Sequence, residues 1–267
     1  MDDLTIRLRD VEKTFGAVQA VQGLSLEVPR GSLIGFLGPN GAGKSTTIRM
    51  IMSIIYPDRG SIDVLGSTAL AAKDRIGYLP EERGLYRKMR VAEYLRYIAR
   101  LKGMQRRDAI AAASAWLDRM ELHNVDRKKC EELSKGMQQK VQFIASIIHE
   151  PDLLILDEPF SGLDPVNAEL LNSVIHDLHQ QGRTIIFSTH VLHQAEQLCD
   201  RILLIDRGRK ILDDTMDGIH RTFDPRTIEV EPLPNAPLPT AIEGVSERTT
   251  CGDTGVELHL DPDVDAH

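Results

Sequence analysis

Hydrophobic and polar residues alternate along two stretches near the start of the chain. Residues 4–11 ("LTIRLRDV") and 18–28 place apolar side chains at about every second position, which is the period of a strand with one buried face. Short continuous apolar runs, which are typical of strands buried on both faces, follow at 32–38, 153–156, 184–187 and 202–205. The pattern therefore predicts half-exposed strands near an edge and several fully buried strands.

Helical spacing separates the buried runs. From Lys44 to Ile55 the pattern is that of a helix, and the turn residues of "YPDRG" (56–60) close it. A second apolar face at helical spacing consists of Leu170, Leu171, Val174, Ile175 and Leu178. Because strands alternate with helices of this length, we predict βαβ units and an α/β fold with a mostly parallel sheet.

Two regions depart from this alternation. Residues 85–133 show no strand pattern, while Ala113, Trp116, Leu117 and Met120 recur at helical spacing, which predicts a helical subdomain. After residue 222, "EPLPNAPLP" (231–239) is too rich in proline for the interior of an element. "TIEVE" (227–231) and "GVELHL" (255–260) are predicted strands. We expect one domain over 1–221 and a small α+β extension over 222–267.

Composition limits the classes of partner. The chain has 267 residues, is 42% hydrophobic and carries a formal net charge of −8, so it lacks the broad positive field on which nucleic-acid binding depends. Its three cysteines, Cys130, Cys199 and Cys251, are far apart and fit reduced thiols better than a disulfide framework or a zinc site. No apolar run approaches the length of about 18 residues needed to span a bilayer, and the N-terminus is unlike a signal peptide. We expect a cytoplasmic protein that reaches a membrane only through a partner.

The stretch "GPNGAGKST" (38–46) joins a predicted buried strand to a predicted helix. It matches the pattern G-x-x-x-x-G-K-[ST], in which glycines let backbone N–H groups point at phosphate oxygens and the helix adds its positive end. Lys44 is expected to reach the β- and γ-phosphates, and Ser45 to hold Mg²⁺. The predicted phosphate-binding residues are Gly38, Pro39, Asn40, Gly41, Ala42, Gly43, Lys44, Ser45 and Thr46.

A buried run, "LLILDEP" (153–159), ends in two adjacent carboxylates, which would be costly in a core without a counter-charge. Ligands of open α/β sheets bind at the carboxyl ends of strands, so Asp157 is expected to help hold Mg²⁺. Glu158 points differently and is predicted to orient or deprotonate an attacking water. The guanine motif N-K-x-D is absent from the sequence, which argues against a GTPase.

One further stretch, "LSKGMQQK" (133–140), poses a local conflict. Ser134 is a good N-cap, because its hydroxyl accepts from an otherwise unpaired N–H of the first helical turn. Gly136 lies just inside the same helix, where glycine lowers helix stability. A helix start with a tolerated glycine is one interpretation, and a function for the bare backbone is the other.

These motifs occur in the order found in the nucleotide-binding subunit of ATP-binding-cassette (ABC) transporters, which residues 4–215 resemble. "LSKGMQ" (133–138) resembles the family's signature, usually LSGGQ. "SGLD" (161–164) resembles its D-loop, and "STH" (188–190) resembles the stretch that carries its switch histidine. The resemblance implies that the nucleotide is ATP.

The resemblance also implies that two cassettes pair head to tail. Ser134, Gly136 and Gln138 of one copy would then contact the ATP held by the phosphate loop of the other, with Asp164 orienting that loop across the dimer. In this arrangement a side chain at position 136 would block the phosphate. The implied partner is a second copy or a similar cassette.

Three more residues take their roles from the family. Phe15 is aligned with the aromatic that stacks on adenine, and His190 with the histidine that contacts the γ-phosphate and fixes the water with Glu158. Glu81, in "GYLPEERGLY" (77–86), stands where the family has a Mg²⁺-binding glutamine. A glutamate can still ligate Mg²⁺ but adds negative charge near the triphosphate. Lys135 is a second departure, because the family commonly has glycine there.

The sequence is most similar to the exporter branch that includes sodium-extrusion and drug-resistance ATPases. This implies an ATPase subunit at the inner face of the cell membrane, bound to a separate integral permease, and a C-terminal domain of which 222–267 is expected to be the incomplete beginning. Two alternatives differ in class. A soluble cassette ATPase of translation or DNA repair is disfavoured by the single phosphate loop and the acidic balance, and a non-hydrolysing sensor by Asp157, Glu158 and His190.

Overall fold

The computed structural model describes residues 4–82, 84–222, 227–230, 242–251 and 255–261. The chain divides into two compact units, Met1–Asp214 and Thr215–His267. The boundary lies seven residues before the one expected from the sequence. Each unit is described separately below.

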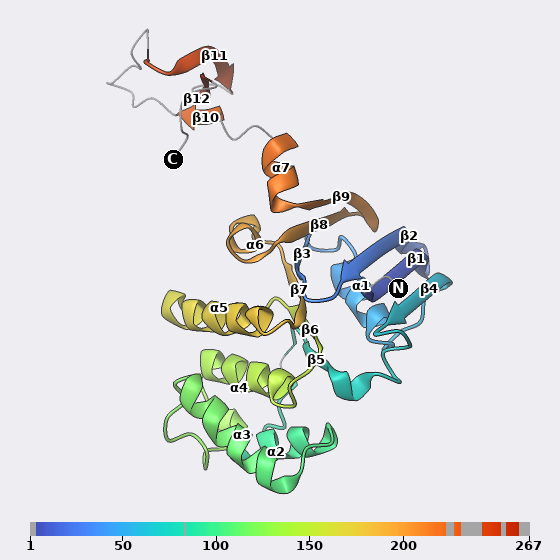
Figure 1. Cartoon of the computed structure of the whole chain (residues 1–267), viewed down its shortest axis with the longest axis vertical. Helices are drawn as coiled ribbons and strands as arrows, with labels where there is room; N and C mark the ends of the chain where they lie inside the picture. Colours follow the sequence, from blue (N-terminus) through green and yellow to red (C-terminus); the bar gives the residue numbers. More distant parts are fainter. Residues whose placement is uncertain (1–3, 83, 223–226, 231–241, 252–254, 262–267) are drawn as a thin grey trace. The chain divides into compact units, whose positions relative to one another are not determined.

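A six-stranded sheet forms the centre of the first unit (Figure 1). Its strands, in spatial order, are β5 (Ile76–Leu79), β6 (Leu153–Asp157), β7 (Thr184–Thr189), β3 (Leu33–Leu37), β8 (Arg201–Asp206) and β9 (Arg209–Thr215). The first five strands pair in parallel, and β3, β6 and β7 are buried along their whole length. The α/β fold and a strand at each of the four continuous apolar runs are therefore confirmed, although β8 is only partly buried.

Helices connect these strands and bury their apolar stripes against them. They are α1 (Lys44–Ile51), α5 (Pro165–Gln180) and α6 (Leu192–Leu198). The predicted stripe of α5 is largely confirmed, because Leu171, Val174, Ile175 and Leu178 are buried. The helix predicted over 44–55 ends four residues early, since Ser53 adopts a positive φ of 56° that an α-helix does not accommodate.

The alternating stretches near the N-terminus form a separate antiparallel sheet in the order β2-β1-β4. Its strands are β1 (Leu4–Phe15), β2 (Val18–Pro29) and β4 (Arg59–Val64). Figure 1 shows α1 between this sheet and the parallel one. Ile48, Met50 and Ile51 of α1 belong to one core with residues of both sheets, so the phosphate loop ahead of α1 lies at the junction of the two sheets.

The region from 85 to 133 is helical, as predicted. It contains α2 (Val91–Leu101), α3 (Arg106–Arg119) and a 3₁₀ turn (Cys130–Glu132), and α4 (Lys135–Ile147) follows. Ala113, Leu117 and Met120 are buried, and α2, α3 and α4 contact one another. Among the described residues, no helix is both long enough and apolar enough to cross a membrane.

The second unit contains α7 (Met216–Thr222) and an antiparallel sheet in the order β10-β12-β11. Strands β10 (Thr227–Val230) and β12 (Gly255–Leu260) correspond to the two predicted strands. Strand β11 (Val245–Cys251) was not predicted, because "VSERTTC" has little apolar character. The proline-rich stretch 231–239 lies outside the described residues.

Candidate functional site

The phosphate loop connects β3 to α1, and two of its glycines are required by the fold. Gly38 and Gly43 have positive φ angles of 151° and 103°. A Cβ atom at Gly38 would lie 2.2 Å from the Ile205 carbonyl oxygen, and one at Gly43 would lie 2.4 Å from that of Ala20. No other residue type fits these positions without moving backbone, so the glycines are explained by packing as well as by phosphate binding.

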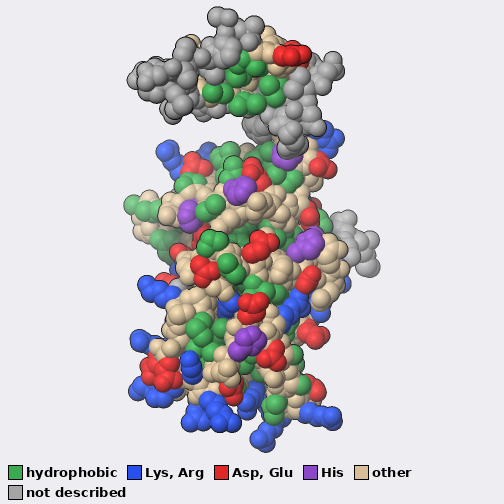
Figure 2. Space-filling model, turned by 90° about the vertical axis from the view of Figure 1, so that its left-hand side faces the viewer, with side chains coloured by type: hydrophobic (Ala, Val, Ile, Leu, Met, Phe, Trp, Pro, Cys, Tyr) green, Lys and Arg blue, Asp and Glu red, His purple; other side chains and the backbone are tan. Residues whose placement is uncertain are grey.

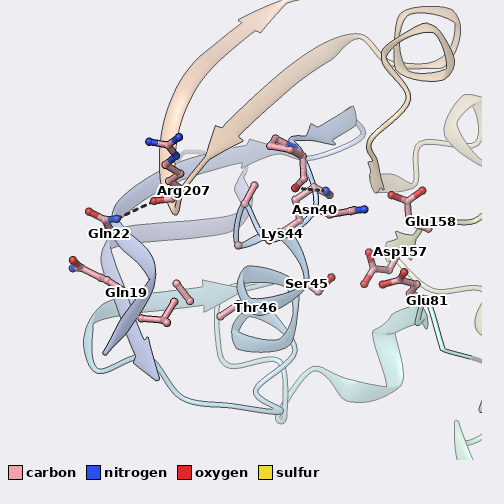
Figure 3. A pocket seen from close by; sticks show the side chains of 16 residues that line it. Gln19, Gln22, Asn40, Lys44, Ser45, Thr46, Glu81, Asp157, Glu158 and Arg207 are labelled. Atoms are coloured by element: carbon pink, nitrogen blue, oxygen red, sulfur yellow. Dashed lines mark hydrogen bonds between the residues drawn. The ribbon is translucent and has the colours of Figure 1, made fainter. Parts of the chain in front are cut away.

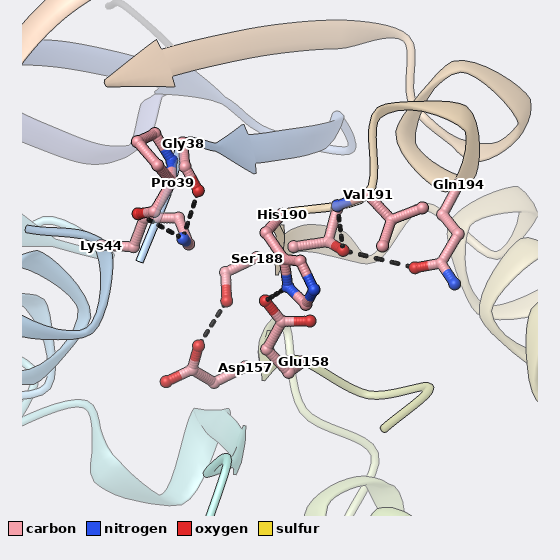
Figure 4. A network of polar contacts seen from close by, with 10 residues as sticks. Gly38, Pro39, Lys44, Asp157, Glu158, Ser188, His190, Val191 and Gln194 are labelled. Carbon is pink, nitrogen blue, oxygen red and sulfur yellow. Dashed lines mark hydrogen bonds and ion pairs between the residues drawn. The ribbon is translucent and has the colours of Figure 1, made fainter. Parts of the chain in front are cut away.

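Lys44 is buried and folds back over the loop that precedes it (Figure 4). Its ammonium donates to the carbonyl oxygens of Gly38 at 2.5 Å and Pro39 at 3.2 Å. These bonds satisfy a charge that would otherwise be costly to bury. They also hold the ammonium at the loop, beside the positive end of α1. The ammonium and the helix end together attract an anion.

A cavity of about 550 Å³ opens on the phosphate loop. Figure 3 shows the carboxylates of Glu81, Asp157 and Glu158 gathered at one end of it, with Gln19 and Arg207 at the other. Its walls are formed by Val18, Gln19, Ala20, Gln22, Pro39, Asn40, Gly41, Ala42, Gly43, Lys44, Ser45, Thr46, Glu81, Asp157, Glu158 and Arg207. The structure thus brings the predicted phosphate loop and the predicted carboxylates to one cavity.

Five residues of this wall were not predicted, namely Val18, Gln19, Ala20, Gln22 and Arg207. Gln19 and Gln22 lie on β2, and Arg207 lies in the turn between β8 and β9. Gln22 donates from its amide to the Arg207 carbonyl at 2.9 Å. In the sequence all five stand in strand and turn positions without a motif, so no signal distinguished them from the ordinary residues of a half-exposed strand or turn.

Asp157 ends β6 and is almost fully buried. Burial raises the pKa of its carboxyl, and the hydroxyl of Ser188, which donates to it, offsets part of that rise. Ser45 and Lys44 favour the ionised form to a smaller extent. A carboxylate held in this way at the carboxyl end of a parallel sheet is suited to receive a cation.

Glu158 has a left-handed backbone, with a φ of 48°. Its N–H donates to the Ser188 carbonyl at 3.1 Å, and its Oε1 lies 2.7 Å from Nδ1 of His190 (Figure 4). The Glu158 side chain is 15% exposed and lines the cavity, whereas the His190 side chain is 54% exposed. This pair is arranged to accept a proton from a water at the cavity edge.

The donors near Asp157 also fit Mg²⁺. A carboxylate and a hydroxyl are hard oxygen ligands, and Mg²⁺ commonly binds through one or two carboxylates together with waters and substrate phosphates. Asp157, Ser45 and Glu81 share the cavity wall. Among the described residues no group of three or more His, Cys, Asp or Glu side chains is clustered as an all-protein metal site, so the phosphates would have to complete the coordination.

A second hollow, of about 290 Å³, contains the start of α4 and shares no lining residue with the first. Ser134 is the N-cap of α4 and accepts from the N–H of Met137 at 3.3 Å, as predicted. A Cβ atom on Gly136 would make only ordinary contacts, 3.6 Å to a Leu163 methyl group and 3.7 Å to the Gly162 carbonyl. Nothing among the described residues of this chain therefore requires glycine at position 136.

Asp164 lies in this second hollow with Ser134 and Gly136. It is the N-cap of α5 and accepts from the backbone N–H of Asn167 at 2.9 Å and from its side-chain amide at 2.6 Å. These bonds hold the pKa of the Asp164 carboxyl below its usual range. The carboxylate is therefore ionised and fixed in position within the hollow.

Two predicted ATP contacts lie elsewhere. The amide of Gln138 donates to the carbonyl oxygens of Cys130 and Leu133, at 3.2 and 3.1 Å, and the residue does not line the second hollow. Phe15 is half exposed and pairs across the β1–β2 hairpin with Val18, which does line the first cavity. The structure thus places Phe15 next to the cavity wall and Gln138 outside the second hollow.

Comparison with known proteins gives a consistent family. The model of the ABC transporter family matches residues 21–161. The ABC transporter ATP-binding protein YhaQ of Bacillus subtilis (strain 168) is 43% identical over 94% of this chain and 84% of its own length. The daunorubicin resistance ATP-binding protein DrrA3 of Streptomyces coeruleorubidus is 39% identical over 82% of this chain and 71% of its own.

Solved structures give the same fold. An ATP-binding subunit of an ABC transporter superposes with a TM-score of 0.76 at 31% identity, covering 82% of this chain and 93% of that one. The ATP-binding cassette MJ0796, solved as a dimer bound to ADP and Pi, superposes with a TM-score of 0.73 over 79% of this chain and 98% of that one. At 22% identity the second likeness establishes the fold alone.

Proposed function

The chain belongs to the ABC transporter family as an ATP-binding and ATP-hydrolysing subunit of exporter type, and from this premise we propose that two copies pair head to tail to drive a separate membrane permease. Each copy would supply the phosphate loop of one site and the start of α4 of the other. The names of the relatives, which include a drug-resistance protein, support the exporter direction.

One observation carries this proposal. The phosphate loop and the start of α4 line two different hollows of the same chain, so the start of α4 does not line the cavity of its own phosphate loop. No described residue of the same chain gives a steric reason for Gly136, although glycine costs a helix about 1 kcal/mol relative to alanine. A phosphate approaching the bare backbone from a second copy supplies the missing reason.

Within a complete site, the residues would divide the work as follows. The phosphate-loop N–H groups and Lys44 bind the phosphates. Asp157, Ser45 and Glu81 would hold Mg²⁺, which when bound would supply charge neutralisation for the transferred phosphoryl group. Glu158 takes the proton of the attacking water, and His190 orients that carboxylate through their 2.7 Å contact.

Across the proposed dimer, Ser134 and Gly136 donate to the γ-phosphate, and the ionised Asp164 orients the facing phosphate loop. Phe15 would stack on adenine beside Val18, with which it pairs. Gln138 would act indirectly, because its amide already ties the 3₁₀ turn to α4. This assignment keeps Gln138 in the signature as a support for Ser134 rather than as a ligand.

We also propose that the subunit works at the inner face of the cell membrane, where the helical subdomain over 85–133 passes ATP-driven motion to the permease. Residues 1–221 would act as the cassette, and 222–267 as a small appended domain. Co-purification in detergent with a multi-span membrane protein is the expected result. Recovery with ribosomes or DNA instead would contradict the permease assignment.

A complementation experiment tests the shared sites. Lys44→Ala removes the phosphate-loop ammonium, and Gly136→Trp fills the second hollow, so either variant alone is expected to lose turnover. In an equal mixture half the dimers are mixed, and each carries one intact site, so turnover should recover to at most about a quarter of the parental rate. No recovery, or full activity of either variant alone, would contradict head-to-tail pairing.

A further inference from the structure

Two glutamines lie buried on one face of α4. Polar side chains belong mostly at the surface, and Figure 2 shows Lys, Arg, Asp and Glu spread over the face that it draws. Gln139 and Gln142 are instead only 2% and 4% exposed. They are three residues apart, so they lie on the same side of the helix. Neither of them lines the ATP cavity or the second hollow.

The Gln142 amide holds the loop that carries Glu81. Its Nε2 donates to the carbonyl oxygens of Pro80 at 3.3 Å and Glu82 at 3.2 Å, so both neighbours of Glu81 are tied to α4. Glu81 itself is exposed, which means that packing does not fix its carboxylate at the cavity wall. The direction of this carboxylate therefore depends on the backbone that Gln142 holds.

The Gln139 amide makes the corresponding bond beside a second carboxylate. Its Nε2 donates to the Pro159 carbonyl at 2.9 Å, and Pro159 directly follows Glu158. Glu81 and Glu158 both lie at the carboxylate end of the cavity (Figure 3). One face of α4 thus holds the backbone beside two of the three carboxylates of the site.

The packing of α4 suits it to set these positions. A Cβ atom on Gly77 of β5 would lie 2.1 Å from the Ser146 carbonyl oxygen of α4, so the two backbones are in direct contact one turn beyond Gln142. At its other end α4 begins beside Ser134, in the second hollow. A single helix therefore connects the second hollow to the loops of the ATP cavity.

Stability does not explain the Gln142 amide. Its Oε1 is buried and has no hydrogen-bond partner among the described residues, and an unpaired buried acceptor lowers the free energy of unfolding. An apolar side chain of similar length would fill the same space without that cost. What the amide adds is the pair of donated bonds, and these bonds act on the Glu81 loop.

We infer that Gln142 and Gln139 are positioning residues of the ATP site. Gln142 directs Glu81 toward the position of Mg²⁺, and Gln139 directs Glu158 toward the attacking water. The inference rests on the proposed function, in which Glu81 would hold Mg²⁺ and Glu158 takes the proton. Because neither glutamine lines the cavity, each acts by fixing the backbone beside a carboxylate, as groups that orient metal ligands and catalytic groups do.

Equilibrium binding of adenylyl imidodiphosphate, a non-hydrolysable ATP analogue, tests the role of Gln142. Calorimetry on the full chain gives its Kd once with EDTA and once with Mg²⁺, and we call the ratio of the two values the magnesium gain. Light scattering is used to choose conditions with single copies, so that pairing does not contribute. Gln142→Met keeps an unbranched side chain but cannot donate to the two carbonyls. We expect its magnesium gain to fall about 10-fold, while the Kd in EDTA stays at the parental value.

Gln139→Met is the matched variant, because it removes an equally buried amide from the same helix. It should leave the magnesium gain unchanged but lower the rate of hydrolysis at saturating MgATP about 10-fold or more, since a small displacement of a catalytic group is costly. Gln142→Leu, with a shorter apolar side chain, should repeat the result of Gln142→Met. Equal loss of the magnesium gain in Gln139→Met and Gln142→Met would show a general loosening and overturn the inference. A parental rate of hydrolysis in Gln139→Met would overturn the role of Gln139.

Glu81→Ala separates this inference from the proposed function. It should lower the magnesium gain by itself, and adding Gln142→Met should lower it no further, because Gln142 acts through Glu81. A fall in Glu81→Ala together with a parental gain in Gln142→Met would overturn the inference alone. An unchanged gain in Glu81→Ala would overturn both the metal-binding role of Glu81 and the role of Gln142.

Discussion

The imidazole Nδ1 of His190 lies 2.7 Å from the carboxylate Oε1 of Glu158. The two residues are far apart in sequence but follow β7 and β6, which are neighbours in the parallel sheet. Their carboxyl ends therefore meet at one edge of the cavity. The contact fixes the direction of the carboxylate, so a proton-accepting oxygen is in place before any water arrives.

Glu158→Gln is expected to remove that acceptor while keeping the shape of the side chain. ATP should still bind and close the dimer, but the rate of hydrolysis should fall by about 10²- to 10⁴-fold, the usual contribution of a general base. Steady-state phosphate release and size-exclusion chromatography with MgATP measure the two effects. Glu169→Gln, on the exposed surface of α5, is the control, and a parental rate in Glu158→Gln would exclude the assigned base.

Gly136→Ala should separate folding from dimer formation. Because the added methyl group makes only ordinary contacts, and alanine favours helix, the free energy of unfolding is expected to stay level or rise by up to about 1 kcal/mol. ATP-dependent dimerisation in the Glu158→Gln background should be lost, since the methyl group meets the phosphate of the other copy. Chemical denaturation and light scattering measure these quantities.

Gly43→Ala is the contrasting variant for that experiment. Its Cβ would lie 2.4 Å from the Ala20 carbonyl oxygen in a backbone with positive φ, so a loss of stability of about 2 kcal/mol or more is expected. If Gly136→Ala destabilised the monomer as much as Gly43→Ala, the second-copy explanation of Gly136 would be wrong.

Asp157→Asn should stabilise the ligand-free protein but abolish its response to MgATP. The buried carboxylate has a raised pKa because burial disfavours its charge, and asparagine keeps an acceptor for Ser188 without that charge. The ligand-free protein is expected to gain about 1 kcal/mol, whereas MgATP should no longer raise its melting temperature. Asp118→Asn, at an exposed position on α3, serves as the control, and an unchanged MgATP effect in Asp157→Asn would contradict the cation-binding role.

The stability of the fold should decrease as the pH is lowered, because His149 is buried without a charge. Burial, together with the nearby Lys102 ammonium, lowers the pKa of this imidazole to about 4, so the unfolded chain binds a proton between about pH 6.5 and 4 that the folded chain does not. The free energy of unfolding is therefore expected to decrease by about 2 kcal/mol as the pH falls through this window. Denaturation curves at several pH values measure it.

His149→Gln supplies the comparison. Glutamine can still donate to the Ile76 carbonyl, which the imidazole contacts at 3.1 Å, but it has no charge to gain. Its pH dependence should be flatter, while the exposed His176→Gln should behave as the parent. Identical slopes in His149→Gln and the parent would remove this histidine as the cause.

The sequence predicted elements with a strong periodic signal and missed those without one. Strands β3, β6, β7 and β8 are largely apolar and could be read directly. Strands β4 and β9 are mostly exposed and polar, and β5 has only four residues, so their apolar periods are too weak or too short. Their pairing is set by contacts with distant strands that a local pattern does not contain.

The candidate site shows the same division. Lys44, Asp157 and Glu158 stand in motifs whose chemistry can be recognised from residue types and spacing. Arg207 and Gln22 reach the cavity only because the β8–β9 turn packs against β2.

The Ala20 carbonyl touches both Gly43 of the phosphate loop and Gly208 of the β8–β9 turn, where an added Cβ would lie 2.4 and 2.7 Å away. Three chain segments converge on this single oxygen atom. The affinity for the nucleotide should consequently depend on how closely the antiparallel sheet packs against the parallel sheet. A destabilising substitution in β1 or β2, far from the triphosphate, would then first weaken ATP binding, while the parallel sheet remained folded.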